Sequence, residues 1–506
     1  MIKEAFIKSF IFLSWFLVVT SCQDEFFTDK GFPEVHTIEA SPLAGGGMSF
    51  KARIVSTGQS DSVEYGFIWG PSEGESYANF DYAKLGFIRK TGEYSYHALS
   101  TVANGGKYIV GAYLKTDKII SYGNFIEFSG NGSVPPELLS VNPSSGKFRD
   151  TIILKGRNFA FKLSSNQVHV NDKIANIVSA SSEELKVVIP YLDEGDATIS
   201  VSVKNATSTG SLNFHILAPE ENYSWVGLNA FPGSKRTNAA SFSINGKGYT
   251  GTGQISDMTV VNDFWEYNPA TDQWVRKADY PYYLTNATGF SIGDYGYIGF
   301  GKELDFGSTD LTRYDPSSNT WQSMSAAQEP GSTMTSPAFI IGGIVYLAVL
   351  NNFQIYNHLT DIWVQESSDL DFLGNSVAFS LNGKGYTGIG RNPYKNKDEN
   401  LFFEFNPLYG TLTRKSDFPG TPRNGAIYFT LPNGKGYVGL GYATDTDEYL
   451  KDLWEYNPDT DSWIQIKDFP GPARKGAAFF VIGNSAYIGF GNGSAFYNDF
   501  WRFTPE

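Results

Sequence analysis

A tryptophan-bearing motif recurs through the C-terminal half of the chain and limits the folds that this half can adopt. The stretch "DFWEYNPATDQW" begins at Asp263 and returns as "DLWEYNPDTDSW" from Asp452. A third copy, "DFWRFTPE", begins at Asp499 and stops before its closing tryptophan. The closing position recurs every 42 to 51 residues and is held by Trp274, Trp321, Trp363, Leu412 and Trp463. A period of this length, built on short aromatic strands, is typical of propeller blades.

The number of units follows from the inner strands of the repeat. Six such strands are present: "AASFSI", "ATGFSI", "SPAFII", "SVAFSL", "GAIYFT" and "AAFFVI". The closing positions number only five, but "NYSWVGLNAFPG" places Trp225 49 residues before Trp274. We therefore expect an N-terminal strand at Trp225 to complete the sheet that "DFWRFTPE" leaves open, which would remove free sheet edges. The prediction is a six-bladed β-propeller over residues 222–506.

Glycine pairs recur at the ends of the second strands of the repeat. The pairs are Gly251/Gly253, Gly299/Gly301, Gly388/Gly390, Gly439/Gly441 and Gly489/Gly491. With the tryptophan motif, this pattern resembles the kelch repeat. The resemblance implies that the glycines lie where inner strands crowd a central channel, and that each tryptophan packs between neighbouring blades.

Two smaller all-β domains are expected before the propeller. Residues 33–130 alternate apolar and polar positions in short segments, as half-buried sandwich strands do, and resemble fibronectin type III-like modules. Residues 134–218 contain "TIILKGRNF" and a strand ending in "VVIP", and they resemble an IPT/TIG domain, which has an immunoglobulin-like fold. The expected fold class is thus all-β: two immunoglobulin-like sandwiches followed by a six-bladed kelch propeller closed by an N-terminal strand. Such domains often serve as spacers, so we interpret the pair as a stalk.

The N-terminus has the features of a lipoprotein signal peptide. Residues 1–21 combine two early lysines with the apolar run "FIFLSWFLVV", which is too short to be a good membrane span. The run ends at Cys22 in "VTSC", which resembles the bacterial lipobox. Lipidation of Cys22 is therefore predicted, with residues 22–32 as anchor and tether. The following "QDE" resembles the export signal of surface lipoproteins in Bacteroidota-type bacteria and predicts an outer-membrane protein that faces outward.

Composition excludes several kinds of chemistry. The net charge is −14 and no basic cluster is visible, which argues against nucleic acid as a partner. Cys22 is the single cysteine, so disulfides and thiolate metal sites are excluded. The propeller has one histidine, His358, and this rules out a galactose oxidase-type copper site. His358 replaces the proline of the other repeats and is interpreted as a turn residue. The acidic "DTDE" of 445–448 lacks a full set of calcium ligands, and no metal or other cofactor is predicted.

Candidate ligand-binding residues come from one position of the repeat. Arg236, Arg423 and Arg474 precede the inner strands of three blades, where symmetry predicts that they face the mouth of the central channel. At nearby positions the other blades carry Asn286, Thr335 and Asn375. Tyr394 and Tyr442 lie in long loops expected on the same face, where they would stack on sugars. The alternative for the arginines is a structural role in joining blades.

Three functions remain open from the sequence. The first is a surface binding protein, anchored in the membrane only by its lipid, whose propeller captures a glycan or a surface or secreted protein. The second is an enzyme similar to the sialic acid epimerase (mutarotase) family, which needs an acid–base group and cations for a sugar carboxylate. The third is a structural or adhesion module. The lack of an acid–base constellation favours binding over catalysis.

Overall fold

A computed structural model describes residues 31–60, 62–73, 80–204, 206–219, 223–256, 259–303, 306–327, 338–349, 352–367 and 373–505. The predicted signal peptide and Cys22 lie outside these residues. The chain divides into two compact units, Met1–Ala98 with Val102–Asn131 and Leu99–Thr101 with Gly132–Glu506.

The first unit is a pair of antiparallel sheets. One sheet has the order β1 (Pro33–Pro42), β2 (Met48–Thr57), β5 (Gly92–Ala98). The other has the order β4 (Asp81–Ile88), β3 (Val63–Pro71), β6 (Lys107–Lys115), β7 (Ile120–Ser129). Phe50 of β2 packs on Phe67 and Trp69 of β3, with ring centroids 5.8 and 5.4 Å apart, so the two sheets face each other across an aromatic core.

The second unit begins with a separate β domain. Its strands are β8 (Glu137–Asn142), β9 (Ser145–Gly146), β10 (Thr151–Arg157), β11 (Asn166–Val170), β12 (Lys173–Ala180), β13 (Glu184–Val188), β14 (Gly195–Val203), β15 (Ala206–Thr207) and β16 (Leu212–Ile216), with a 3-10 turn, η2 (Leu163–Ser165), before β11. They pair in the order β8-β10-β13-β12-β11-β14-β16-β9, and β15 pairs with β14. Alternate residues such as Ile152, Leu154 and Val168 are fully buried in one core. The period-2 pattern of the sequence thus forms this domain.

The rest of the described chain forms six four-stranded antiparallel sheets, here called sheets 1 to 6. Sheets 1 to 3 consist of β18 (Ala240–Ile244), β19 (Lys247–Gly251), β22 (Phe264–Asn268), β23 (Gln273–Arg276); β24 (Thr288–Ile292), β25 (Tyr295–Gly299), β28 (Leu311–Asp315), β29 (Thr320–Ser323); and β30 (Ala338–Ile341), β31 (Ile344–Val349), β32 (Asn352–Asn357), β33 (Ile362–Ser367).

Sheets 4 to 6 consist of β34 (Val377–Leu381), β35 (Lys384–Asn392), β36 (Lys397–Asn406), β37 (Thr411–Arg414); β38 (Ile427–Leu431), β39 (Lys435–Gly439), β42 (Leu453–Asn457), β43 (Ser462–Gln465); and β44 (Ala478–Ile482), β45 (Ser485–Gly489), β46 (Phe500–Pro505), β17 (Tyr223–Leu228). Short hairpins extend sheets 1, 2 and 5 between the second and third strands: β20 (Gln254–Ser256) with β21 (Thr259–Val260), β26 (Lys302–Glu303) with β27 (Phe306–Gly307), and β40 (Tyr442–Ala443) with β41 (Glu448–Tyr449).

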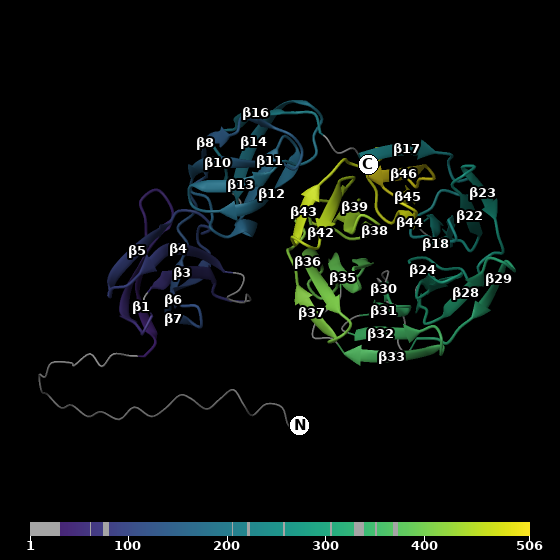
Figure 1. Ribbon diagram of the computed structural model, residues 1–506, viewed down its shortest axis with the longest axis horizontal. Coiled ribbons are helices and arrows are strands. Elements are labelled where there is room, and N and C mark those ends of the chain that lie inside the picture. The colour runs from purple at the N-terminus through teal and green to yellow at the C-terminus, as the bar shows by residue number, and fades with distance from the viewer. Residues whose placement is uncertain are drawn as a thin grey trace, which may run out of the picture. The chain divides into compact units, whose positions relative to one another are not determined.

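The six sheets are arranged in a ring with their first strands innermost (Figure 1). The expected closing strand is present, because β17 pairs with β46 from Tyr223 opposite Pro505 to Leu228 opposite Phe500. Trp225 in this strand is the missing tryptophan of the repeat: its indole Nε1 donates to the Lys467 carbonyl, as that of Trp463 does to the Ser416 carbonyl. Sheet 6 is therefore assembled from both ends of the repeat region, and the ring is closed within this sheet by the hydrogen-bonded pairing of β17 with β46.

Two features of the repeat motif, the tryptophan and the aspartate in the turn before it, join a sheet to its neighbour. The Trp321 ring of sheet 2 packs 4.8 Å from Phe264 of sheet 1, and Trp463 of sheet 5 packs 5.0 Å from Phe402 of sheet 4. In the turn before the tryptophan, Asp461 has φ 49° and accepts from the Tyr456 hydroxyl and from the Ser416 amide of the preceding loop. The motif thus recurs because every unit needs the same seam.

The glycine pairs have a different role from the one implied by the resemblance. A Cβ on Gly439 would lie 2.5 Å from the Asp452 carbonyl oxygen of the neighbouring strand in the same sheet. Gly441 has φ 104°, which a side chain disfavours, and its amide donates to the Arg474 carbonyl of the next sheet. The pairs therefore permit close backbone contact at the loop end of the five sheets that carry them, and this crowding lies within the sheet rather than across the channel.

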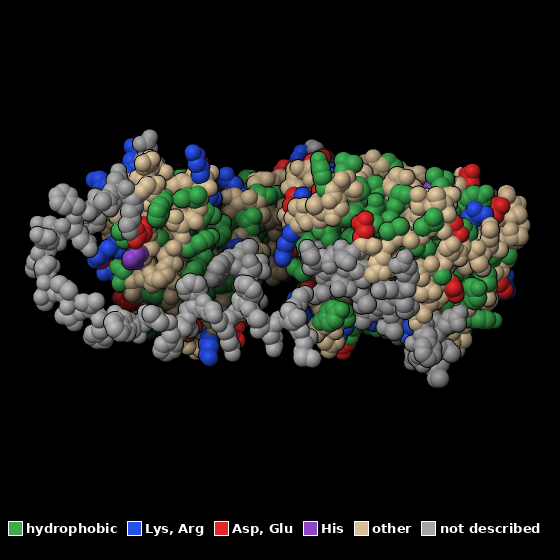
Figure 2. All heavy atoms as spheres, turned by 90° about the horizontal axis from the view of Figure 1, so that it is seen from below, with side chains coloured by type: hydrophobic (Ala, Val, Ile, Leu, Met, Phe, Trp, Pro, Cys, Tyr) green, Lys and Arg blue, Asp and Glu red, His purple; other side chains and the backbone are tan. Residues whose placement is uncertain are grey.

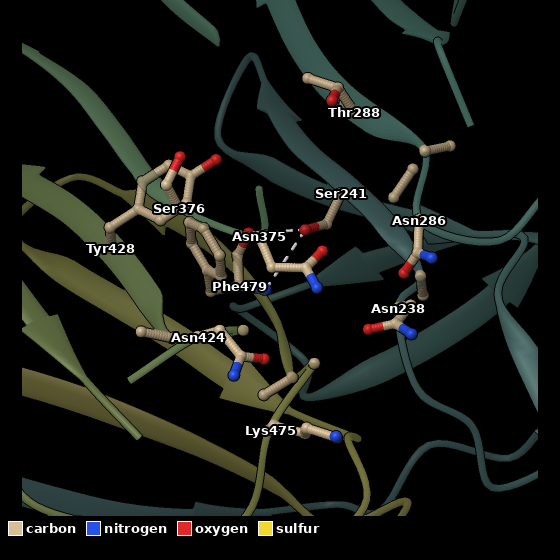
Figure 3. A pocket seen from close by; sticks show the side chains of 18 of the residues that line it. Asn238, Ser241, Asn286, Thr288, Asn375, Ser376, Asn424, Tyr428, Lys475 and Phe479 are labelled. Atoms are coloured by element: carbon tan, nitrogen blue, oxygen red, sulfur yellow. Dashed lines mark hydrogen bonds between the residues drawn. The ribbon is translucent and has the colours of Figure 1, made fainter. Parts of the chain in front are cut away.

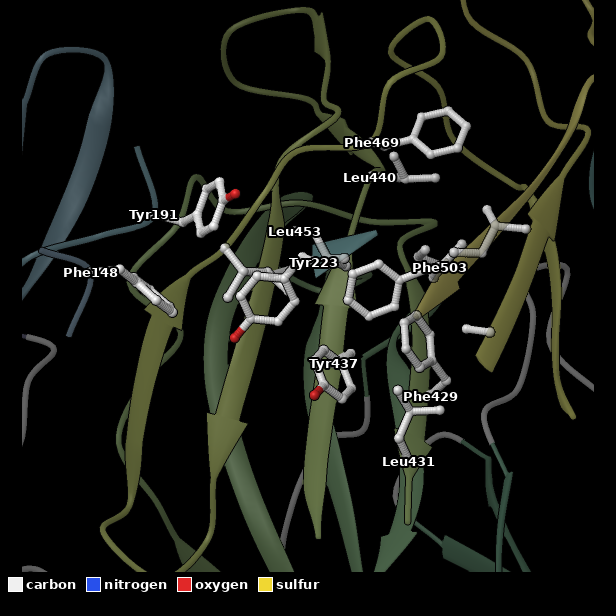
Figure 4. Close-up of a cluster of buried hydrophobic side chains, with 14 residues drawn as sticks. Phe148, Tyr191, Tyr223, Phe429, Leu431, Tyr437, Leu440, Leu453, Phe469 and Phe503 are labelled. Carbon is white, nitrogen blue, oxygen red and sulfur yellow. The ribbon is translucent and has the colours of Figure 1, made fainter. Parts of the chain in front are cut away.

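The second domain packs on the seam between sheets 5 and 6. Phe148 and Tyr191 of that domain form a triangle of rings with Tyr223 of β17, with centroids 5.5 to 5.9 Å apart (Figure 4). Arg149 donates to the Tyr223 hydroxyl and to the buried Glu455 carboxylate at 3.0 and 2.9 Å. These contacts tie the closing strand to the sheet beside it.

Candidate functional site

In five of the six sheets the rim of the ring carries one described residue with a left-handed backbone. Asn238, Asn286, Asn375, Gly425 and Gly476 occupy equivalent places, with φ between 48° and 63°. Their backbones form a chain of hydrogen bonds around the ring: 286 donates to 238, 238 to 476, 476 to 425 and 425 to 375, at 2.8 to 3.3 Å. Asparagine and glycine tolerate this conformation best, which accounts for their presence here.

A cavity of about 260 Å³ opens inside this rim (Figure 3). Polar side chains surround it: Asn238, Asn286, Asn375, Asn424, Lys475, Ser241, Ser376 and Thr288. The rings of Tyr428 and Phe479, 4.9 Å apart, lie on one side of it, whereas Ser241, Gly289 and Ala338 hold the equivalent places in sheets 1 to 3. The cavity is therefore asymmetric, with aromatic rings on one side and small residues on the other.

Two groups in the cavity wall titrate. Burial raises the pKa of the Tyr428 hydroxyl to about 12, so this group stays protonated near neutral pH. Burial also lowers the pKa of the Lys475 ammonium, while the nearby Asp398 opposes and Arg391 adds to that effect. The Lys475 Nζ lies 4.3 Å from the centre of the Tyr442 ring, and within the described part of the chain it forms no ion pair. The cavity thus offers one cation among neutral amides.

The predicted arginines do not contribute to this cavity. Arg236, Arg423 and Arg474 are at most 1% exposed. Each makes a two-pronged ion pair within its own sheet; the pairs are Arg236–Asp263, Arg423–Asp452 and Arg474–Asp499, with N–O distances of 2.5 to 2.8 Å. The prediction that they face the channel mouth is therefore wrong.

Further contacts fix each guanidinium. Its Nη1 also donates to a carbonyl, that of Thr252, Leu440 or Phe490. Its plane lies 4.8 to 4.9 Å from a phenylalanine ring, that of Phe231, Phe418 or Phe469. We call each set of arginine, aspartate and phenylalanine an arginine clamp. Since the guanidinium is enclosed by its own sheet, the clamp has a structural role. The sequence offered a structural role as the alternative for these arginines, but expected them to join neighbouring blades, whereas the clamp acts within one sheet.

Of the other predicted ligand-binding residues, some lie at the cavity and some do not. Asn286 and Asn375 line the cavity. Tyr442 is half-buried beside it, and its hydroxyl donates to Asp447, which raises the pKa of Tyr442. Tyr394 is 65% exposed on the turn between β35 and β36 and is not among the residues that line the cavity. Thr335 and Cys22 lie outside the described residues.

Several residues at the cavity were not predicted. Asn238, Asn424 and Lys475 each follow an arginine in the sequence by one residue or two, and they were overlooked in favour of that arginine. The signal was available, because aligning Asn286 and Asn375 with the other repeats points to Asn238. Asp398, which the Asn424 amide contacts at 2.9 Å, belongs to a longer hairpin that the repeat alignment does not place.

Other site types are not supported in the described residues. No group of three or more His, Asp and Glu side chains is placed to hold a metal ion there. His358 lies in a turn, with Nδ1 2.9 Å from the Gly343 carbonyl. On the face seen in Figure 2, Lys and Arg side chains are scattered among acidic and apolar ones. Within residues 31–505, gaps apart, no helix has the length and apolar character needed to cross a membrane.

Comparison with known families gives one clear assignment. Residues 136–216 match the IPT/TIG domain family. This segment is an IPT/TIG domain. The match agrees with the immunoglobulin-like strands β8 to β16 and with the resemblance seen in the sequence.

Two further similarities are more limited. The chain is 32% identical over 72 residues to an N-acetylneuraminate epimerase of Pasteurella multocida (strain Pm70), a stretch that spans 13% of this chain and 19% of that enzyme. The chain thus matches about a fifth of the enzyme's length. A solved structure, a structural genomics protein of unknown function from Bacteroides thetaiotaomicron VPI-5482, shares 13% identity at a TM-score of 0.40 and covers 74% of this chain and 98% of its own.

Proposed function

We propose that this chain is a lipid-anchored outer-membrane protein whose six sheets are the blades of a kelch propeller that binds sugar at the rim cavity. In this proposal Cys22 carries the lipid, a fibronectin type III-like domain and the IPT/TIG domain form the stalk, and the propeller faces outward. The closed ring of sheets, the kelch-like motif and the lipobox-like sequence support this arrangement. The rim cavity is the single observation that carries the sugar-binding function.

The chemistry of the cavity suits a sugar. Carboxamides carry a donor and an acceptor side by side, so Asn238, Asn286 and Asn375 can pair with neighbouring hydroxyls of a pyranose. The rings of Tyr428 and Phe479 offer apolar area to the C–H face of the same sugar. At about 260 Å³ the cavity lies just below the ~300–1,000 Å³ usual for small-molecule sites, so it fits one sugar residue.

The test removes the rim amides without straining the backbone. Residues 23–506 would carry Asn238→Gly, Asn286→Gly and Asn375→Gly together, because glycine already holds the same place at Gly425 and Gly476. The matched control is Asn245→Gly, another left-handed asparagine, which lies in an exposed turn.

Binding to a panel of neutral and acidic mono- and oligosaccharides would be measured by calorimetry. We expect the triple variant to bind its best sugar at least about tenfold more weakly, and the control to bind like the natural chain. A panel without a single binder would exclude this function and favour a protein partner, the third function left open by the sequence.

A second candidate is catalysis of sugar anomer exchange. The 72-residue similarity to an N-acetylneuraminate epimerase favours it, together with the Lys475 amine, which can exchange a proton at the cavity wall. Exchange between the anomers of N-acetylneuraminate would be followed by NMR line broadening with and without protein. An exchange rate that the protein leaves unchanged would exclude this activity, and a rate that Lys475→Met lowers would assign it to this amine.

A further inference from the structure

We infer that Lys475, Tyr442 and Tyr449 form a second subsite, which holds an anionic sugar residue linked to the residue in the rim cavity. This inference rests on the proposed sugar binding and extends it from one sugar to an acidic chain end. Its ligand class is a glycan whose second residue carries a carboxylate or a sulfate.

The subsite breaks the symmetry of the ring. Tyr442 holds a position that Gln254, Lys302, Arg391 and Asn492 hold in sheets 1, 2, 4 and 6, as the backbone bridges to the rim show. At this position tyrosine stands in sheet 5 alone among the described sheets, and it faces Tyr449 across the hairpin β40–β41 with ring centroids 4.9 Å apart. The residue at this position differs from sheet to sheet, and among the described sheets only sheet 5 places an aromatic ring there.

The subsite is continuous with the cavity. Lys475 lines the cavity, and its Nζ reaches over both tyrosine rings, 4.3 Å from the centre of Tyr442 and 5.9 Å from that of Tyr449. A sugar that leaves the cavity on this side therefore meets the ammonium first and the two half-buried rings next. The apolar face of a pyranose would cover those rings.

The subsite is held in place before any ligand arrives. The buried Asp398 of sheet 4 accepts from the Asn424 side chain at 2.9 Å and from the Thr444 amide of the hairpin at 2.8 Å. Asn424 in turn bridges Tyr442 through both backbone groups, at 2.9 and 3.0 Å. A fixed site loses little entropy on binding, which favours affinity.

Within the described part of the chain Lys475 forms no ion pair, although the hairpin that carries the two tyrosines also has the exposed Asp445, Asp447 and Glu448. Asp398 is the carboxylate whose charge acts on this lysine, but its two oxygens already accept from Asn424 and Thr444, and Arg391 lies 3.5 Å away. Arg391 and Asp398 form an ion pair with each other, so of these three groups Lys475 is the cation without a carboxylate partner in the described residues. The ammonium is thus half-buried, lies over two aromatic rings and has no carboxylate in direct contact. An anionic group of the ligand would therefore supply its ion-pair partner.

The test compares an acid with its uncharged ester. The probes are digalacturonate, its dimethyl ester and a sulfated chondroitin disaccharide, measured by calorimetry on residues 23–506. We expect an anionic disaccharide to bind about tenfold more tightly than the ester, and the gain to shrink as salt is added. The digalacturonate and chondroitin arms distinguish a carboxylate from a sulfate as the preferred anion.

Variants then separate the subsite from the cavity. Lys475→Met should abolish the preference for the acid over the ester, whereas Lys247→Met, a control lysine at the start of β19, should preserve this preference. Tyr449→Ala should weaken acid and ester alike, by several fold. Acid and ester that bind equally to the natural chain would overturn the subsite but leave the rim cavity intact. If the Asn238→Gly/Asn286→Gly/Asn375→Gly variant bound the probes as tightly as the natural chain, the proposed sugar binding at the rim cavity would be overturned. If no probe bound at all, both the rim cavity and the subsite would be overturned.

Discussion

Sheets 5, 6 and 1 differ from sheets 2 and 4 at the position that precedes the inner strand. The first three carry the arginine clamps. Sheet 4 has Leu373 and Leu401 at the arginine and aspartate positions, and sheet 2 has Leu284 opposite a retained Asp310. The clamps thus stand together on the three sheets around the closure, where no peptide bond completes the ring.

The comparison shows that one position can be filled by a charged pair or by an apolar pair. A buried ion pair adds little net stability over a well-packed apolar pair, but losing one partner is costly. The IPT/TIG domain packs at the same place, through Arg149 on Glu455 and Lys173 on Asp468 at 2.5 Å. The closure of the ring is therefore reinforced twice: by the arginine clamps within sheets 5, 6 and 1, and by the IPT/TIG domain that packs beside them.

The largest effect is expected from breaking one clamp. Arg423→Leu would leave Asp452 largely buried without its cation, and we expect a loss of about 3–5 kcal/mol in the free energy of unfolding measured in urea. The Asp452 carboxylate would keep only the Trp454 indole donor, 2.7 Å away.

The matched control converts sheet 5 to the arrangement of sheet 4. Arg423→Leu with Asp452→Leu should recover most of the lost free energy, because neither partner is then left unpaired. A double variant as unstable as the single one would show that the clamp has a role that apolar packing cannot replace.

A smaller effect is expected at the contact between the IPT/TIG domain and sheet 5. Arg149→Met removes the cation from Glu455, whose carboxylate keeps the hydroxyls of Tyr223 and Tyr437. We expect a loss of about 1.5–3 kcal/mol, the usual value of a hydrogen bond to a charged group, in urea unfolding followed by tryptophan fluorescence. Arg157→Met, whose pair with Glu137 is exposed, serves as the control and should change little.

A smaller difference in stability at low pH is expected between sheets with a clamp and sheets without one. Burial alone would raise the pKa of Asp263 and of Asp452, but the hydrogen bonds and charge of Arg236 and Arg423 outweigh it and lower both below 3.8. A lowered pKa in the folded state gives stability that is complete above about pH 3.8 and is lost as pH falls through the folded-state pKa.

The Arg423→Leu/Asp452→Leu variant should therefore lose less stability than the natural chain as the pH falls from about 4 to about 2. Thermal unfolding followed by circular dichroism at each pH would show the difference. Parallel pH profiles for the two proteins would contradict the assignment of this stability to the clamp.

The smallest effect is expected where half a clamp already exists. Leu284→Arg would place a guanidinium near Asp310 and over Tyr280, the residue that replaces phenylalanine in sheet 2. We expect the free energy of unfolding to change by no more than about 1 kcal/mol, since a buried pair and an apolar contact are close in energy. A loss of several kcal/mol would show that sheet 2 has repacked beyond the clamp geometry.

Much of the architecture could be read from the sequence, because it depends on local patterns that repeat. The intervals between tryptophans, the count of inner strands and the place of Trp225 are all set by short-range packing, and β17 pairs with β46 as those patterns predict. The IPT/TIG domain was likewise predicted from the sequence, over residues 134–218, and the family match covers residues 136–216.

Only the tertiary structure decided which side chains face the cavity. Arg236, Thr237 and Asn238 are consecutive, and the left-handed backbone at Asn238, with the bridge from Thr237 to Gln254, turns successive side chains in different directions. The arginine turns into its own sheet toward an aspartate about 27 residues further along the chain, and the asparagine turns to the rim. A repeat alignment locates this turn to within a residue or two, but the direction of each side chain depends on contacts between strands that no local pattern records.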